Sequence, residues 1–210
     1  YYVIANTSAS AVQAVNKAIS QGKSVYLTDD GYIVDRDTFA SLLPNYAIYG
    51  EALYKVPNGP TLKPLKIYSP NYHYNWTGVD APAHTSLVLK KLGFQIVDTP
   101  EEADVIVLEN NRYDASIFGK KPTLVIGGEA MQKLEKLGVL SGFDAEKLKG
   151  GSDYEGLMKA IIDDQDPLTS GYKKNALFYS NSGNWIEKVP SNFKTLMSIA
   201  SSDYYIAGWW

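Results

Sequence analysis

Apolar residues recur at helical spacing near the start of the chain, at Ala11, Val12, Val15, Ala18 and Ile19. Asn6, Thr7 and Ser8 stand before this run, and side chains of this kind accept hydrogen bonds from the first N–H groups of a helix. Gly22 follows the run, where helices often end in a left-handed residue. The pattern therefore predicts a helix between Ser8 and Gly22.

A β-hairpin is predicted directly after this helix. Residues 24–28 form a short strand-like run, Asp29-Asp30-Gly31 is a turn sequence, and residues 32–34 form a second run. Three prolines and a glycine between Pro57 and Pro64 then favour a linker. Residues 1–60 are therefore expected to form a small α+β unit, whose strands could also join the main sheet.

From residue 65 onward, apolar strand-like runs alternate with helical segments. The strands are predicted at residues 65–68, 94–97, 104–108 and 123–126. A helix capped by Asp80, with Pro82 in its first turn, is predicted to end at Gly93, and a second helix follows Gly127-Gly128. This alternation predicts an α/β domain over residues 61–210, with a mostly parallel sheet flanked by helices as in flavodoxin-like folds.

The last third of the chain has a less regular pattern. Residues 154–162 are predicted to be helical, residues 176–179 to form a strand, and residues 193–200 to form a strand or a short helix. The charged pairs Glu135-Lys136 and Glu146-Lys147 are expected on helix surfaces. The aromatic end at Gly208-Trp209-Trp210 suggests that the full-length protein continues.

Composition excludes several kinds of chemistry. The 210 residues contain no cysteine, which excludes a thiol nucleophile, a disulfide and a thiolate metal site. His73 and His84 lack metal-ligand spacing, so we expect no metal and no cofactor. The net charge is −3 and the sequence has no basic stripe, so we expect no binding to nucleic acid. No apolar run reaches the roughly 18 to 20 residues that span a membrane.

Several motifs, taken in order, resemble class I glutamine-amidotransferase-like domains. They are the strand before Tyr68-Ser69-Pro70, the 104–108 strand, the strand entering Gly127-Gly128, and the run from Asp166 to Tyr172. More narrowly, the chain is similar to the version at the C-terminal end of large secreted zinc carboxypeptidases of the carboxypeptidase A-like superfamily. In those chains a P-L-x-x-G-Y run precedes a strand and G-W closes a later one, as Pro167-Leu168, Gly171-Tyr172 and Gly208-Trp209 do here.

The chain departs from an active amidotransferase at the catalytic positions. Such an enzyme needs a cysteine at a strand-to-helix elbow and a downstream histidine as base. Residues 127–131 stand at that elbow without a cysteine, and no histidine follows His84. The resemblance therefore implies a bacterial, secreted or cell-surface domain with no catalytic residue of its own, joined to a separate zinc peptidase domain.

Two places could bind a ligand at the carboxyl edge of the predicted sheet. The first is the aromatic loop after the 65–68 strand, and the second combines the segment after the 104–108 strand with the glycine turn. The candidate residues are Tyr68, Asn71, Tyr72, His73, Tyr74, Trp76, Glu109, Asn110, Gly127, Gly128 and Glu129. Tyrosine and tryptophan provide contact area for a sugar or peptide, and a helix N-terminus favours an anionic group.

Three readings of function follow from these residues. In the first, the domain is an accessory module that either packs on the other domains of its own polypeptide or binds a cell-wall peptide or glycan. In the second, it is a hydrolase that uses Glu109 or Glu129 with His73 or His84. In the third, it is a structural assembly domain without a ligand. Asp29, Asp30, Asp35 and Asp37 are expected in a solvated turn, although carboxylates of this kind can also bind calcium.

Overall fold

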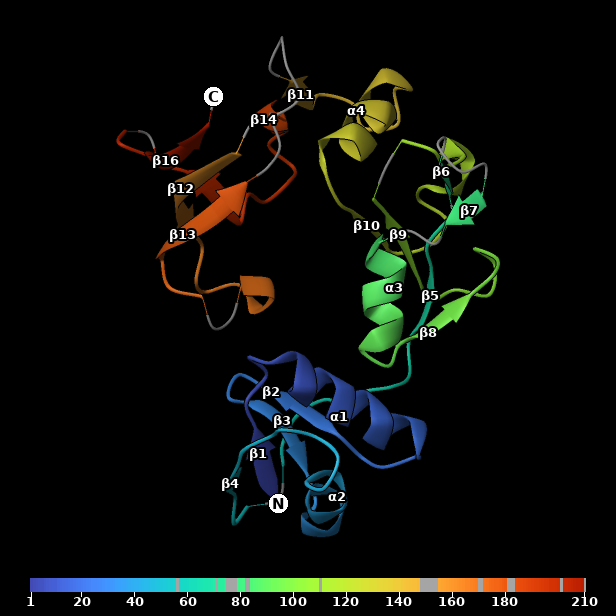
Figure 1. The fold of residues 1–210 in the computed structure, drawn as a ribbon, viewed down its shortest axis with the longest axis vertical. Helices are drawn as coiled ribbons and strands as arrows, with labels where there is room; N and C mark the ends of the chain where they lie inside the picture. Colours follow the sequence, from blue (N-terminus) through green and yellow to red (C-terminus); the bar gives the residue numbers. More distant parts are fainter. Residues whose placement is uncertain are drawn as a thin grey trace. The chain divides into compact units, whose positions relative to one another are not determined.

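The computed structural model describes residues 1–55, 57–70, 72–74, 79–81, 84–109, 111–147, 155–169, 172–180, 184–200 and 202–209 (Figure 1). The chain divides into two compact units. One consists of Tyr1–Val107 and Ile117–Leu124, and the other of Leu108–Ser116 and Val125–Trp210. The boundary near residue 60 that the prolines indicate stays a prediction.

The first unit begins with a four-stranded antiparallel sheet in the order β2-β3-β1-β4. Its strands are β1 (Tyr2–Ile4), β2 (Tyr26–Thr28), β3 (Gly31–Val34) and β4 (Gly50–Ala52). Two helices accompany it, α1 (Ala9–Ser20) and α2 (Arg36–Leu42). A buried apolar core joins the sheet to both helices, and it contains Ile4, Ala11, Ala14, Val15, Ala18, Ile19, Val25, Val34, Phe39 and Leu42.

The helix predicted at the start of the chain is confirmed as α1. The Oγ of Ser8 accepts a hydrogen bond from the N–H of Ala11 at 3.1 Å, and Gly22 has a φ of +74° after the last turn. The following helix, α2, was not predicted. Asp35 caps it by accepting hydrogen bonds from the N–H and the Oγ1 of Thr38, at 2.8 and 2.7 Å. The expectation that Asp35 and Asp37 lie in a solvated turn is therefore wrong.

The same unit contains most of a four-stranded parallel sheet in the order β10-β9-β5-β8. Its strands are β5 (Lys66–Tyr68), β8 (Gln95–Val97), β9 (Val105–Leu108) and β10 (Thr123–Val125). Helix α3 (His84–Lys91) connects β5 to β8, and the 3₁₀ turn η1 (Ala115–Ile117) precedes β10. The first strand lies inside the sheet with later strands on both sides, which is the arrangement of flavodoxin-like sheets.

Helix α1 is hydrogen-bonded to the end of α3. The Nδ2 of Asn16 donates to the carbonyl of Leu92 at 2.8 Å, and the Nε2 of Gln13 donates to the carbonyl of Lys91 at 3.0 Å. The last carbonyls of a helix have no partner within the helix itself. These two side chains of α1 therefore provide hydrogen-bond donors for carbonyls at the C-terminal end of α3.

The segment after β5 contains a short antiparallel pair, β6 (Tyr72–Tyr74) and β7 (Val79–Ala81). His73 pairs with Asp80 in its register. The predicted aromatic loop is therefore partly a strand. Asp80 does not cap the next helix, because α3 begins at His84.

The second unit contains helix α4 (Gly128–Lys136) and two antiparallel sheets. One sheet pairs β11 (Asp144–Lys147) with β14 (Asn184–Lys188), and α4 lies against both of these strands. In the other, β12 (Glu155–Ile162) pairs with β13 (Asn175–Ser180) on one side. The opposite edge of β12 pairs with β15 (Met197–Ile199) and β16 (Tyr205–Trp209). The 3₁₀ turn η2 (Pro167–Thr169) lies between β12 and β13.

Two predictions in this region are wrong. Residues 155–162 form a strand and not a helix, and Glu146-Lys147 lies in β11 and not on a helix surface. Residues 156, 158, 160 and 162 of β12 are buried while their neighbours are more exposed, which is the two-residue period of a strand. In its described residues the chain is thus an α/β protein with one parallel sheet and several antiparallel sheets.

No helix in the described ranges combines the length and the apolar character needed to span a bilayer.

Candidate functional site

The turn between β10 and α4 has the geometry of a strand-to-helix elbow. Only Ile126 and Gly127 separate the strand from the helix, and Gly127 has a φ of +88°, which favours glycine. The N–H of Ile126 donates to the carbonyl of Leu108 at 2.7 Å, which holds the turn beside the end of β9. A Cβ placed on Gly127 would lie 3.9 Å from the carbonyl oxygen of Glu109. The backbone after β9 is thus a close neighbour of this turn.

The helix that follows the elbow starts without a side-chain cap. Its N-cap residue is Gly127, and Gly128 is the first helical residue. Glu129 is exposed in the first turn, where the helix dipole favours a carboxylate. The same carboxylate would repel a bound anion. Glu109, Gly127, Gly128 and Glu129 all belong to the second unit, and their common role in a site stays a prediction.

Tyr113 and Lys133 anchor α4 to the segment after β9. The Oη of Tyr113 donates to the carbonyl of Ala130 at 2.8 Å, in a buried position. The Nζ of Lys133 donates to the carbonyls of Asn111 and Tyr113 and lies 4.6 Å from the centroid of the Tyr113 ring. Burial raises the pKa of Tyr113 to about 12, so this phenol stays neutral at physiological pH. Sequence reasoning missed both residues, because nothing in their spacing links positions 113 and 133.

The other candidate edge, at the carboxyl end of β5, belongs to the first unit. Tyr68 is half-buried there, and burial, followed by the charge of Glu101, raises the pKa of its phenol. The next residue, Ser69, is buried, and its Oγ has no hydrogen-bond partner in the described part of the chain. This orphan hydroxyl has no sequence signal, since serine is common after strands.

The remaining predicted site residues belong to different parts of the chain. Asn71, Trp76 and Asn110 lie outside the described residues. Tyr72, His73 and Tyr74 are placed as backbone in β6. His84 is an exposed residue at the start of α3 in the first unit, whereas Glu109 and Glu129 belong to the second. The pairing of a carboxylate with a histidine therefore stays a prediction.

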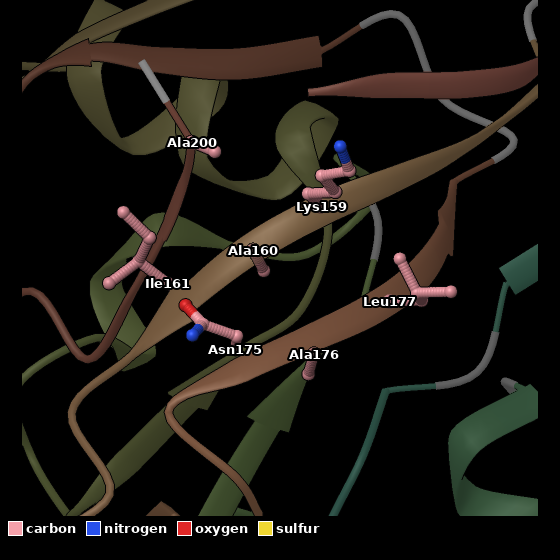
Figure 2. A pocket seen from close by; sticks show the side chains of 7 residues that line it. All are labelled: Lys159, Ala160, Ile161, Asn175, Ala176, Leu177 and Ala200. Atoms are coloured by element: carbon pink, nitrogen blue, oxygen red, sulfur yellow. The ribbon is translucent and has the colours of Figure 1, made fainter. Parts of the chain in front are cut away.

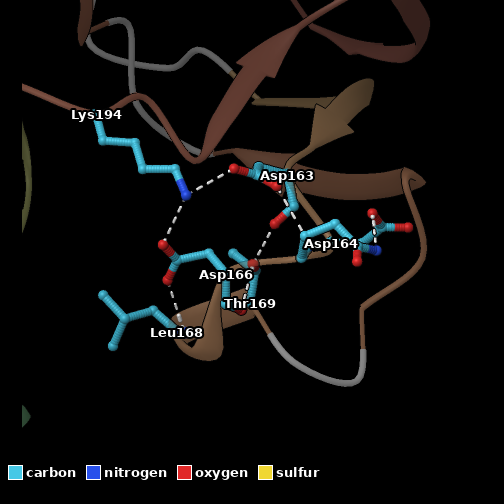
Figure 3. Close-up of polar contacts among 7 residues, drawn as sticks. Asp163, Asp164, Asp166, Leu168, Thr169 and Lys194 are labelled. Atoms are coloured by element: carbon cyan, nitrogen blue, oxygen red, sulfur yellow. Dashed lines mark hydrogen bonds and ion pairs between the residues drawn. The ribbon is translucent and has the colours of Figure 1, made fainter.

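The run from Asp166 to Thr169, which carries part of the sequence resemblance, forms a polar cluster with Lys194 (Figure 3). The Nζ of Lys194 lies 2.8 Å from an oxygen of Asp163 and 2.8 Å from an oxygen of Asp166. Asp166 also accepts a hydrogen bond from the N–H of Leu168 at 2.9 Å. Hydrogen bonds from Lys194 lower the pKa of both carboxyls, and these carboxyls raise the pKa of Lys194. The cluster joins two chain segments, so we assign it a structural role.

A hollow of about 350 Å³ lies along β12 and β13 in the second unit (Figure 2). It is lined by Lys159, Ala160, Ile161, Asn175, Ala176, Leu177 and Ala200. The one ionisable group in this lining is Lys159, and its Nζ already pairs with Asp203 at 2.6 Å. The hollow therefore offers apolar contact but no acid or base for catalysis. In the described ranges, no three His, Asp or Glu side chains are grouped so that they could hold a metal ion.

No protein-family model matches this chain, and no curated protein is significantly similar to it. Among solved structures, it is similar to a protein from Thermoplasma acidophilum that has been assigned as a subunit of GMP synthase. The identity is 19%, the match covers 66% of this chain and 75% of that chain, and the TM-score is 0.43. The strand order and pairing of this chain define its α/β architecture.

Proposed function

We propose that this chain is a non-catalytic, amidotransferase-like accessory domain of a secreted zinc carboxypeptidase. The observation that carries the proposal is the elbow between β10 and α4. Its backbone has the shape that would expose a nucleophile at a helix N-terminus, yet Gly127, Gly128 and Glu129 occupy it. The chain has no cysteine elsewhere and no histidine after His84. The parts of a glutamine-hydrolysing site are therefore missing while the supporting turn remains.

The anchoring of α4 supports a retained scaffold. The Tyr113 hydroxyl and the Lys133 ammonium fix the helix through three hydrogen bonds to backbone carbonyls. Such contacts position a helix but supply no group that could attack a substrate. A domain that keeps this framework without its nucleophile is suited to packing or binding.

A direct assay tests the absence of catalysis. Purified protein is incubated with glutamine, and ammonia release is followed at pH 6 to 9. We expect no release above the rate without protein, because the chain has no cysteine to supply a thiolate and no histidine after His84 to serve as its base. Glutamine hydrolysis that copurifies with the chain and is altered by Glu129→Gln would contradict the proposal and favour the hydrolase reading.

The accessory role is tested by binding to insoluble peptidoglycan. We expect the protein to sediment with the polymer, and the double variant Tyr72→Ala/Tyr74→Ala to lose sedimentation. Tyr54→Ala is the matched control, because Tyr54 is 97% exposed in the same unit but lies outside the aromatic segment. If the original protein stays in the supernatant, the domain does not bind wall polymer, and packing on a neighbouring domain is the remaining accessory role.

The carboxypeptidase context makes a separate prediction about the gene. The same open reading frame should encode a His-x-x-Glu motif and a more distant second histidine, which together are the ligands of a catalytic zinc. A reading frame without these ligands would remove the peptidase from the proposal and leave the non-catalytic domain in place.

A further inference from the structure

The edge strand β13 is unprotected. In the described part of the chain it pairs with β12 on one side and has no strand on the other. Its sequence, Asn-Ala-Leu-Phe-Tyr-Ser, contains no charge and no proline. Natural sheets usually protect such an edge with charges, proline, a bulge or a very short strand. None of these devices is present within the six residues of β13.

The pairing with β12 shows which backbone groups of β13 point to the open edge. The N–H of Ile162 donates to the carbonyl of Lys174 at 2.8 Å, and the register continues with Ala160 opposite Ala176 and Met158 opposite Phe178. Hydrogen-bonded pairs alternate along an antiparallel ladder, so the even-numbered residues of β13 bond to β12. The N–H and C=O groups of Asn175, Leu177 and Tyr179 therefore point outward.

The same three residues share one face of the sheet. Figure 2 shows Leu177 on the same side as Lys159, which is opposite it in the register, while Ala160 and Ala176 lie on the other side. Leu177 is 60% exposed and Tyr179 is 61% exposed. The open edge thus presents outward backbone groups together with exposed apolar side chains.

We infer that β13 pairs with β13 of a second copy of this chain, antiparallel and centred on Leu177. Around a twofold axis at this residue, Leu177 faces Leu177 of the partner subunit, and Asn175 faces Tyr179 of the partner subunit. The outward residues are spaced by two, so all three meet their partners as hydrogen-bonded pairs. The strand is thus complementary to itself in both backbone and side chains.

The charges around the strand fit this register. Lys174 falls opposite Ser180 of the partner subunit, so no like charges face each other. Each copy contributes its own β13 edge to the pairing, so this contact joins two copies around a twofold axis.

The first experiment measures molar mass by light scattering over a range of protein concentrations. We expect the mass to rise from that of the monomer to that of the dimer. Leu177→Lys places like charges opposite each other at the twofold axis and should weaken dimerisation about tenfold or more. Leu168→Lys is the matched control, because Leu168 is 82% exposed in η2 and outside the strand, and it should leave the dimer unchanged. A monomer at every concentration, or growth into open-ended assemblies, overturns the inference.

The second experiment tests the register, and the absence of native cysteine makes it specific. Residues opposite each other in a hydrogen-bonded pair have Cα atoms about 5.5 Å apart, within the range of a disulfide. Leu177→Cys should therefore form a covalent dimer under mild oxidation. In Tyr179→Cys the two thiols are offset by four residues, roughly 13 Å along the strands, so little covalent dimer should form. Equal cross-linking at both positions overturns the proposed register.

Discussion

Gly208 lies in β16 opposite Gly156 of β12, with a φ of +147°. A Cβ at this position would lie 2.0 Å from the carbonyl oxygen of Glu155 and 2.7 Å from the Cα of Gly156. These are backbone atoms of a paired strand, so they cannot move aside without breaking the ladder. The glycine of the Gly208-Trp209 motif is thus required by the close approach of two strands.

We therefore expect Gly208→Ala to lower the free energy of unfolding by about 3 kcal/mol or more. Gly138→Ala is the control, because Gly138 has a φ of +70° but no atom within 4 Å of an added Cβ. It should cost only about 1 kcal/mol, from the left-handed backbone conformation. Denaturant titrations measure both values, and equal losses would show that the contact with β12 is absent.

Tyr113 gives the chain a specific sensitivity to alkaline pH. Its pKa is about 12 in the folded protein, whereas an exposed phenol titrates near about 10. Its contribution to stability is complete below about pH 10 and is lost as the pH rises toward 12, because the unfolded chain releases this proton first. Tyr113→Phe should lower the free energy of unfolding by about 1 kcal/mol at pH 7, because the hydrogen bond to Ala130 is lost. Between pH 10 and pH 12 the variant should lose less stability than the unsubstituted protein, because it has no phenol to titrate. Stability curves at pH 7, 10 and 11.5 check this, and parallel curves for both proteins would contradict it.

Individual residues were predictable where the chemistry is local. The capping role of Ser8 follows from its place before an apolar run, since the acceptor and the donor are three residues apart. The contacts between Tyr113, Ala130 and Lys133 join residues that are far apart in sequence, so no local rule indicates them. The orphan hydroxyl of Ser69 is likewise defined only by what surrounds it in the fold.

Helix α2 depends on its cap. Hydrogen bonds from Thr38 lower the pKa of the Asp35 carboxyl. Because the pKa of Asp35 is lower in the folded chain than in the unfolded chain, its carboxylate stabilises the fold fully at pH values above the unfolded pKa of about 3.9. This stabilisation is lost as the pH falls through the pKa of the folded state. Asp35→Ala should cost about 1 kcal/mol at pH 7 and less at pH 2.5. Asp35→Asn keeps the acceptor and should cost less than Asp35→Ala at pH 7. Denaturant titrations at the two pH values measure these differences, and equal losses at both would show that the carboxylate does not cap α2.

The secondary structure of residues 155–162 could not be decided from their own sequence. Glu-Gly-Leu-Met-Lys-Ala-Ile-Ile contains good helix formers and an apolar spacing compatible with a helix. In the fold this segment receives strands on both sides, β13 on one and β15 and β16 on the other. Long-range pairing of this kind overrides local preference, because each backbone N–H and C=O finds a partner in another strand.

At the scale of the whole molecule, residues 1–64, which include the proline-rich linker, have a hydrophobic core of their own. Its buried and partly buried members all lie between Tyr2 and Leu62. We expect a fragment of residues 1–64 to unfold cooperatively on heating, as followed by circular dichroism. A fragment of residues 1–55 is the control. It lacks the carbonyl of Pro60 that accepts from Leu27 at 3.1 Å and the N–H of Leu62 that donates to Val25 at 2.8 Å. It should melt at a lower temperature, and an unfolded 1–64 fragment would show that the linker does not mark a domain boundary.

The sequence by itself determined the features that depend on neighbouring residues or on composition. Hydrophobic spacing indicated α1 and the strands of the parallel sheet, because periodicity reports which side of an element is buried. The absence of cysteine excluded thiol chemistry without reference to any fold. Only the tertiary structure decided that β12 is a strand, that Tyr113 and Lys133 hold α4, and that β13 has an open edge. Each of these depends on partners distant along the chain, and their positions are set by packing and strand pairing, which local sequence does not specify.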